Sequence, residues 1–377
     1  MKVVIAPDSF KESLTAKQAC DAIQAGLARV WNDAKFVAIP VADGGEGTVQ
    51  SLVDATQGRI VDVNVMGPQG KRVDAFYGIL GDNQTAVIEM AAASGLHHVP
   101  ITQRDPKLTT SFGTGELMVH ALDQGITKLI IGLGGSATND GGVGMLAALG
   151  AQFTNAEGAP IQLTGGGLRE LSKVDLSHFD PRLQHCDLLV ACDVNNPLCG
   201  PKGASAVFGP QKGASPDDVQ LLDDALQRFG LLSEQVTGKA VLNSAGAGAA
   251  GGMGAALLAY THATLRPGIE IVLETVQFAH QVCDADVVIT GEGRIDSQTV
   301  QGKTPMGVAK VAKRFGVPVI ALCGCTGDNY QAAYECGIDA IFAAVPRAMS
   351  LEEALIESDV NLVDLAENVA RLWVISQ

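Results

Sequence analysis

The chain has 377 residues, of which 47% are apolar and 18% charged, and its net charge is −15. This length is more than one hydrophobic core usually serves, so two domains are expected. No basic run is present that could neutralise nucleic-acid phosphates or an anionic membrane surface, which excludes both as partners.

The first predicted elements alternate between strand and helix. An apolar strand, Val3–Ile5, is followed by a helix that Thr15 and Gln18 begin with a capping box. A second strand, residues 36–41, precedes a helix that ends at Gly58. This alternation is typical of a βαβ unit in a parallel sheet.

The middle of the chain follows a different pattern. Residues 60–65, 73–80 and 85–90 alternate polar and apolar side chains, and Gly81–Asn83 forms the expected hairpin turn between the last two. Short buried strands are predicted at 129–131 and 188–191, and a helix from Ser215 to Gly230. We therefore expect a separate, partly antiparallel region here.

The first pattern returns near the end. A buried strand at 286–290 precedes a helix capped by Thr304 that ends at Gly316. Strands at 317–322 and 340–345 follow, and Ser350 with Glu353 begins a last helix. The simplest arrangement is one parallel α/β domain from residues 1–67 and 283–377, with residues 68–282 inserted as a second domain. Ligands would bind beyond the carboxyl ends of the strands, in a cleft between the domains.

The chain also carries indications of its compartment. Its first residues, MKVVIAPDSFKES, lack the apolar stretch of a signal peptide. None of the eight cysteines belongs to a C-x-x-C pair, so we expect reduced thiols and a cytoplasmic protein. The uncharged stretch from Leu242 to Leu265 is interpreted as a buried loop and helix instead of a membrane span.

Two acid-bearing segments follow the first two strands. In Asp8–Lys11, the lysine could neutralise a carboxylate or phosphate; alternatively, Asp8 and Ser9 cap the following helix. In Asp43–Gly47, two carboxylates among three glycines suit magnesium or a sugar-like hydroxyl. The structural alternative is a helix N-terminus where Glu46 complements the dipole.

Two further segments follow strands in the middle of the chain. Gly132–Gly142 holds five glycines and leads into an apolar helix, a pattern that favours an anion-binding cradle over a simple turn. In Cys192–Leu198, Asp193 is a candidate general base or metal ligand, and an Asx-turn before Pro197 is the alternative.

Three weaker patterns involve glycine and lysine. Gly291–Thr304 resembles a P-loop, but Ser297 stands where a Walker A glycine is required. Lys303 and Thr304 at the start of a helix still favour phosphate binding, and the alternative is an ordinary strand-to-helix loop with a surface lysine. Gly246–Gly251 matches G-x-G-x-x-G, yet little strand precedes it, so close helix packing is expected. The 208–213 stretch could carry a binding lysine or form a solvated loop.

Six segments together resemble the bacterial glycerate kinase family, which is unrelated in fold to protein kinases. They are, in order, APDSFKESL, VADGGEGT, GLGGSATNDGG, CDVNNPL, GAGAAGG and GEGRIDSQTVQGKTP. The resemblance extends from Lys2 to past Val345 without departure in these segments. It implies an α/β fold with a Rossmann-like parallel-sheet domain from both chain ends and an inserted second α/β domain with a mixed sheet.

The resemblance also implies ATP, Mg²⁺ and D-glycerate as working components, with 2-phosphoglycerate favoured over 3-phosphoglycerate as product. A homodimer is compatible with it. Phosphoryl transfer depends on positioning and charge neutralisation. We therefore expect a base, first Asp193 and second Asp296, and lysines that neutralise anionic groups, Lys11 and Lys303.

The remaining expected roles fall into three groups. The nucleotide would contact Gly134, Gly135, Ser136, Thr138, Gly291, Gly293, Lys303 and Thr304. The substrate would contact Ser9, Lys11, Asp43, Gly44 and Arg294. Magnesium would be held by one or two of Asp43, Glu46, Asp140 and Glu292.

Two other function classes remain as alternatives. A nucleotide-dependent oxidoreductase would use Gly246–Gly251 and predicts nicotinamide binding without ATP turnover. A binding protein for a small hydroxy acid predicts glycerate binding that needs no magnesium. The number of carboxylates in glycine-rich loops argues against both.

Overall fold

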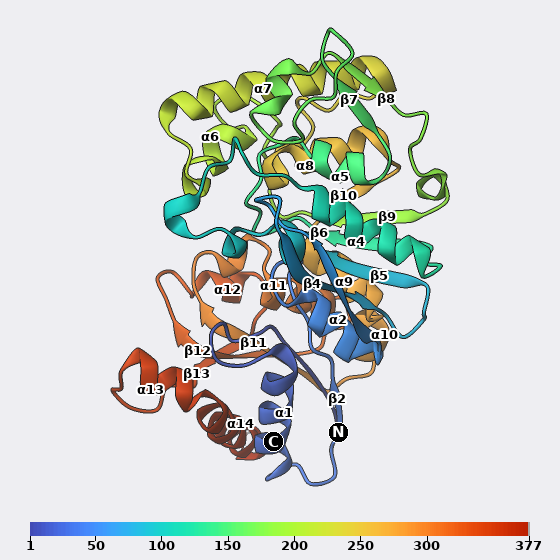
Figure 1. Cartoon of the computed structure of the whole chain (residues 1–377). Coiled ribbons are helices and arrows are strands. Elements are labelled where there is room, and N and C mark those ends of the chain that lie inside the picture. Colours follow the sequence, from blue (N-terminus) through green and yellow to red (C-terminus); the bar gives the residue numbers. More distant parts are fainter. Residues whose placement is uncertain (376–377) are drawn as a thin grey trace. The chain divides into compact units, whose positions relative to one another are not determined.

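The computed structural model describes residues 1–375, which divide into two compact units (Figure 1). Unit 1 comprises Met1–Asp43, Gln50–Gln57 and the chain from Pro267 onward, and unit 2 comprises Gly44–Val49 and Gly58–Arg266. Each unit has its own sheet and its own cluster of buried apolar side chains.

The sheet of unit 1 has five strands, all parallel, and draws on both ends of the chain. The N-terminal strand is an interior strand with a parallel neighbour on each side, and its residues Val3, Val4 and Ile5 are fully buried, as expected for a strand covered on both faces. This confirms the expected parallel α/β domain. In sheet order the strands are β13 (Ala340–Ala343), β12 (Val319–Thr326), β11 (Val287–Ile295), β1 (Lys2–Pro7) and β2 (Lys35–Ala38).

The helices of unit 1 begin largely where the sequence indicates. Capping boxes at Thr15 and at Ser350 start two of them, as predicted. The helix predicted to be capped by Thr304 instead has Lys303 at its N-cap. The helices are α1 (Ala16–Ala28), most of α2 (Thr48–Thr56), α9 (Gly268–Thr275), α10 (Phe278–Val282), α11 (Thr304–Lys313), α12 (Ala332–Glu335), α13 (Leu351–Ile356), α14 (Ser358–Ile375) and the 3₁₀ turn η6 (Thr299–Gln301).

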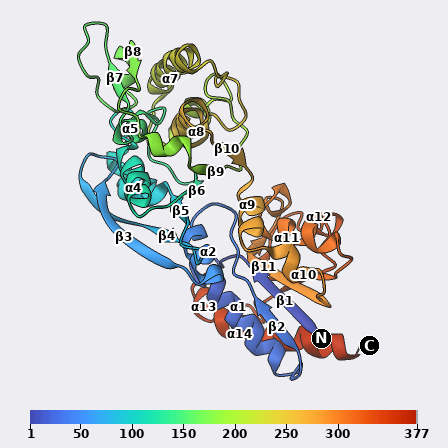
Figure 2. The same ribbon diagram turned by 90° about the vertical axis from the view of Figure 1, so that its right-hand side faces the viewer.

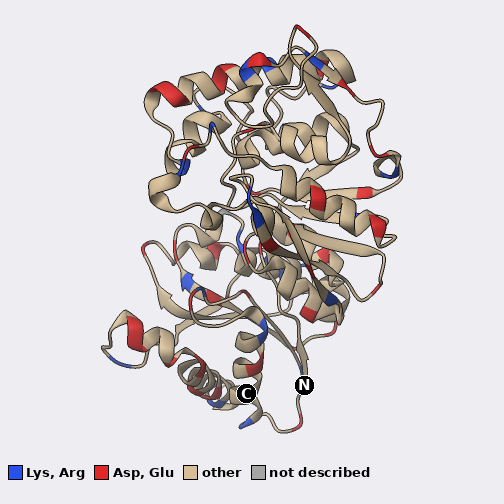
Figure 3. Cartoon of the chain, in the orientation of Figure 1, with Lys and Arg blue, Asp and Glu red and all other residues tan. Residues whose placement is uncertain are grey.

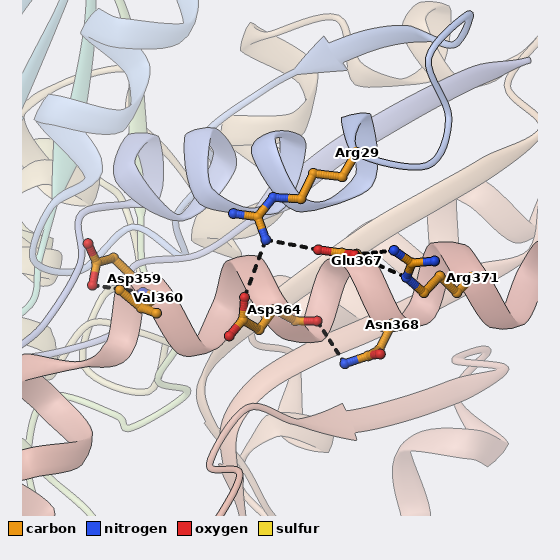
Figure 4. A network of polar contacts seen from close by, with 7 residues as sticks. All are labelled: Arg29, Asp359, Val360, Asp364, Glu367, Asn368 and Arg371. Atoms are coloured by element: carbon orange, nitrogen blue, oxygen red, sulfur yellow. Dashed lines mark hydrogen bonds and ion pairs between the residues drawn. The ribbon is translucent and has the colours of Figure 1, made fainter.

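Helices α1 and α14 pack side by side, the first and last long helices of the chain (Figure 2). Gly26 permits the close approach, because a Cβ there would lie 2.1 Å from the Val363 carbonyl oxygen. At the edge of this contact, Arg29 donates to Glu367 at 2.8 Å and lies 3.4 Å from Asp364 (Figure 4). Exposed pairs of this kind orient helices more than they stabilise them.

The main sheet of unit 2 has six strands and is mixed, as expected. Three pairs of neighbouring strands in this sheet are parallel, and the two pairs at one edge, formed by residues 59–66, 72–79 and 85–89, are antiparallel. A separate two-stranded antiparallel sheet pairs β7 (Gln152–Thr154) with β8 (Lys173–Asp175). In sheet order the strands are β10 (Thr264–Arg266), β9 (Asp187–Ala191), β6 (Lys128–Gly132), β5 (Thr85–Glu89), β4 (Arg72–Ile79) and β3 (Arg59–Met66).

The helices of unit 2 include the longest of the described chain, α7, which Asp and Glu residues make acidic (Figure 3). Ser215 caps it as predicted, but it continues through Gly230, where a Cβ would crowd Leu242 and Leu198, and ends before Gly238. The helices are α3 (Ala91–Ser94), α4 (Phe112–Asp123), α5 (Val143–Ala148), α6 (Ala204–Phe208), α7 (Pro216–Thr237), α8 (Ala249–Tyr260) and the 3₁₀ turns η1 (Leu96–His98), η2 (Ile101–Gln103), η3 (Gly167–Glu170), η4 (Pro181–Gln184) and η5 (Pro210–Lys212).

The unit boundaries differ from the domain boundaries expected after residues 67 and 282. Residues 58–67 group with unit 2, because β3 pairs with β4 along its whole length. Residues 267–282 group with unit 1, because α9 and α10 pack against α11. Within residues 1–375, no helix is long and apolar enough to cross a lipid bilayer.

Candidate functional site

Three carboxylates of unit 1 influence one another where its parallel strands end; we call Asp8, Asp43 and Glu292 the carboxylate cluster. Asp8 directly follows β1, Asp43 follows the end of β2, and Glu292 lies in β11 beside β1. This is the edge at which open α/β sheets bind ligands. Only Asp43 and Glu292 were named as site residues from the sequence.

Asp8 is the member of the cluster for which the sequence left a helix cap as one of two open alternatives. Burial and the nearby Asp43 raise the pKa of its carboxyl to about 6, against hydrogen bonds from Thr304 and Ser9. The Ser9 amide donates to Asp8 Oδ1 at 2.6 Å, and the buried Thr304 hydroxyl donates to Oδ2. Asp8 therefore joins the strand end to the start of α11.

Glu292 is the most buried member of the cluster, only 8% exposed. Burial raises the pKa of its carboxyl to about 7, and the charges of Asp8 and Asp43 add to this, while Thr299 and Lys303 oppose it. The Thr299 hydroxyl donates to Glu292 Oε1 at 2.6 Å. Lys303 is thus the cation that acts on this buried carboxyl.

The cluster fits a divalent cation by the chemistry of its donors. Its carboxylates repel one another, and hard oxygen ligands are what Mg²⁺ prefers. Among the described residues no three His, Cys, Asp or Glu side chains form a metal-binding group. The fit is therefore to an ion held by one or two carboxylates and otherwise by substrate oxygens and water.

The other predicted residues of unit 1 lie around this edge with differing roles. Lys11 is exposed, and Arg294 pairs with Asp296 at 3.3 Å. The Asp296 carboxylate also accepts the Gln298 amide at 2.8 Å, so it holds the turn after β11. Gly291 is a packing residue, since a Cβ there would lie 1.9 Å from the Leu322 carbonyl oxygen, whereas Gly293 has room for one.

In unit 2 the glycine-rich segment Gly132–Gly142, here the glycine loop, lies against Gly44 and Gly45. A Cβ on Gly132 would be 2.5 Å from the Gly44 oxygen. The two segments line a pocket of about 550 Å³ whose walls include Gly44, Glu46, Glu89, Gly134 and Gly135. Glu89, which sequence reasoning missed, accepts the Val49 amide at 2.9 Å, and burial raises the pKa of its carboxyl.

The anion cradle expected where the glycine loop enters a helix is occupied by the chain itself. Asp140 is fully buried, and its carboxylate accepts from the Ser111 amide and hydroxyl and from the amides of Gly142 and Gly144, at 2.7–3.3 Å. Both oxygens are engaged and the side chain is fully buried, so in this structure the Asp140 carboxylate stabilises the loop. The part of the loop left for a ligand is Gly134–Thr138.

The preferred base, Asp193, lies just beyond the end of β9 and is exposed. The Asp193 position therefore matches the expectation of an acid after a buried strand. Asp8, Ser9, Asp43, Glu292, Lys303 and Thr304 come together in unit 1, whereas Gly44, Glu46, Gly134, Gly135, Ser136, Thr138 and Asp193 belong to unit 2.

The Gly246–Gly251 motif serves packing. Within residues 1–375 the element directly before it is the helix α7 and not a strand, and its glycines are buried. A Cβ at Gly248 would lie 2.3 Å from the Pro197 oxygen, and one at Gly251 would lie 2.1 Å from the Thr138 oxygen. The segment therefore packs directly against the glycine loop. The oxidoreductase hypothesis, which was based on this motif, loses its structural support.

Comparison with known proteins gives a consistent family. A family model described as "Glycerate kinase family" matches residues 3–374. A glycerate kinase of Haemophilus influenzae is 55% identical over 99% of this chain and 98% of its own. A glycerate 2-kinase of Escherichia coli is 50% identical over 98% and 97%.

A solved structure shares the fold over the whole chain. The crystal structure of a Salmonella typhimurium LT2 protein assigned as glycerate kinase 2 superposes with a TM-score of 0.93. The two sequences are 53% identical, and the match covers 100% of this chain and 99% of the other. The α/β architecture of each unit is therefore shared with an experimentally determined structure.

Proposed function

The chain belongs to the glycerate kinase family and is a phosphotransferase with an alcohol group as acceptor, and on that premise we propose that it phosphorylates D-glycerate with ATP and Mg²⁺. The proposed product is 2-phosphoglycerate, supported by the 50% identical relative named glycerate 2-kinase. A cytoplasmic location remains a prediction.

The observation that carries this proposal is the carboxylate cluster beside Lys303 and Thr304. Crowded carboxylates suit the binding of a divalent cation, and such a cation together with the adjacent lysine can neutralise charge on a transferring phosphoryl group. Magnesium would be held by one or two of Asp8, Asp43 and Glu292; when bound, it neutralises phosphate charge. Glu46 is the alternative ligand, because it lines the pocket of unit 2.

The residues of the chain then have distinct proposed tasks. Lys303 and Lys11 neutralise anionic groups, and Thr304, through its bond to Asp8, fixes that carboxylate. The Gly134–Thr138 amides contact oxyanions. A carboxylate should orient or deprotonate the attacking hydroxyl. We propose Asp193 as this base, with Asp8 as second candidate in place of Asp296, which Arg294 and the Gln298 amide hold.

A coupled ADP-release assay with ATP, Mg²⁺ and a panel of small hydroxy acids tests the function. We expect turnover that requires both Mg²⁺ and D-glycerate. Absence of ADP release from folded protein with every acid of the panel would exclude the proposed activity.

The base is tested by Asp193→Asn, for which we expect a loss in kcat of about 10²–10⁴. The matched control is Asp187→Asn at the opposite end of the same strand, which should keep near-full turnover. Near-full turnover by folded Asp193→Asn would transfer the assignment to Asp8, to be tested as Asp8→Asn.

A further inference from the structure

Lys212 is a lysine whose ammonium is buried in unit 2 without an ion-pair partner among residues 1–375. Only 2% of the residue is exposed, although it lies in a glycine-flanked turn where a solvated lysine would be unremarkable. Its Nζ donates to the Ser136 hydroxyl at 2.8 Å and to the Thr138 carbonyl at 2.7 Å. Both acceptors belong to the glycine loop.

The charge of this ammonium is poorly compensated. Burial lowers the pKa of Lys212 to about 7, and among the described residues the charge of Asp140 opposes this shift. The Asp140 carboxylate is already engaged by Ser111, Gly142 and Gly144. An ammonium has three donors, and two are used, so its third N–H has no acceptor within the described chain. Such a group is costly to bury.

The same short segment of the glycine loop carries other donors without acceptors. In the described structure the amides of Gly134, Gly135 and Ser136 donate no hydrogen bond to the protein, and Gly134 and Gly135 are exposed, so these donors are open to a ligand. The Thr138 hydroxyl is buried and lacks a partner. Gly135 adopts φ +71°, a left-handed conformation that lets successive amides face one ligand.

We propose that Lys212 is a positioning residue that holds Gly134–Thr138 in shape through Ser136 and Thr138 and supplies the positive charge for an oxyanion bound on that segment. The ligand class is a phosphate or carboxylate oxyanion, which contributes the acceptors that the segment lacks. This inference rests on the proposed function, whose two oxyanion sources are the phosphates of ATP and the carboxylate of glycerate.

The test is Lys212→Met, which keeps the volume of the side chain and removes its charge and donors. Lys173→Met, at an exposed position in the same unit, is the matched control. Affinities for ATP, tripolyphosphate and D-glycerate are measured separately by thermal shift titration, and KM and kcat by ADP release. We expect Lys212→Met to remain folded, with a cooperative thermal transition, and to lose affinity about 10- to 100-fold for one oxyanion source.

The pattern of losses identifies the source. Weaker ATP and tripolyphosphate binding with a raised KM for ATP assigns the site to phosphates, and weaker D-glycerate binding with a raised KM for glycerate assigns it to the carboxylate. Affinities and KM values within about twofold of Lys173→Met would overturn the proposal. If Lys212→Met does not fold, Ser136→Ala decides: unchanged affinities for all three ligands overturn it, and a weakened one supports it.

The two proposals can fail separately. Wild-type protein without ADP release refutes the kinase activity, yet the binding titrations of wild type and Lys212→Met still decide the role of Lys212.

Discussion

Asp43 and Glu292 belong to a pattern that the sequence displays directly, an acid in a glycine-containing segment that follows a predicted strand. The same pattern also produced Asp140, which caps its own loop, and Asp296, which holds a turn. Asp140 is set apart by the four hydrogen bonds that its buried carboxylate accepts, a property of the folded chain. The sequence around Lys212 is equally compatible with a ligand-binding lysine and a solvated loop, because the burial of Lys212 results from packing against a distant loop.

Asp43→Asn tests the cation fit of the carboxylate cluster. We expect the Mg²⁺ concentration for half-maximal rate to rise at least ~10-fold, because one charged ligand is lost. Asp33→Asn, an exposed aspartate of the same unit, should behave as wild type. An unchanged Mg²⁺ requirement in Asp43→Asn would remove Asp43 from the cation site.

The buried Lys212 predicts a pH dependence of stability. Its pKa in the folded state, about 7, lies below the ordinary value of 10.5, so between these values the unfolded chain binds more protons. The free energy of unfolding of wild type, relative to Lys212→Met, should therefore rise as pH increases above about 7, by at most ~1.4 kcal/mol per pH unit. Urea unfolding of both proteins at pH 7, 8 and 9 measures this difference. A difference that stays constant or falls would contradict the burial of a titrating lysine.

Elements of the fold depend on glycines in ways that letter patterns do not reveal. The G-x-G-x-x-G letters of 246–251 are typical of a dinucleotide loop, but here they permit backbone contact with the glycine loop. Helix starts were well predicted, because capping boxes at Thr15, Ser215 and Ser350 are local. The predicted end of α7 at Gly230 is wrong. The helix continues to Thr237, and Gly230 lies within it, where it packs closely against Leu242.

Gly251→Ala should be far more destabilising than Gly238→Ala, although both residues have positive φ. At Gly238 a Cβ would meet no atom within 4 Å, so only the left-handed backbone conformation of the alanine would lower the free energy of unfolding, by about 1 kcal/mol. At Gly251 the Cβ would also strike the Thr138 carbonyl, adding roughly 1–3 kcal/mol. Denaturant unfolding compares them, and equal losses would refute the packing role of the motif.

The contact of α1 with α14 gives a second contrast between packing and exposed charge. Gly26→Ala should destabilise by roughly 1–3 kcal/mol despite the better helix propensity of alanine, because its Cβ would meet the Val363 carbonyl. Arg29→Ala, which removes exposed pairs, should leave the unfolding midpoint close to wild type. The reverse order of the two midpoints would show that charge, and not close approach, holds these helices.

At the scale of the whole molecule, the parallel sheet built from both chain ends could be predicted because strand and helix alternate at each end. The unit boundaries could not, since they depend on non-local partners: β3 joins β4, and α9 joins α11. The division of site residues between two units likewise follows from tertiary contacts, and the order of segments along the chain does not reveal it.

The measurement that tests the central claim most directly is phosphorus NMR of the product formed from ATP, Mg²⁺ and D-glycerate. Coupling of the new phosphate ester to the proton on C2 would identify 2-phosphoglycerate, the predicted result. A signal from 3-phosphoglycerate would contradict the proposed hydroxyl, and the absence of any phosphorylated glycerate from folded protein would contradict the proposed function itself.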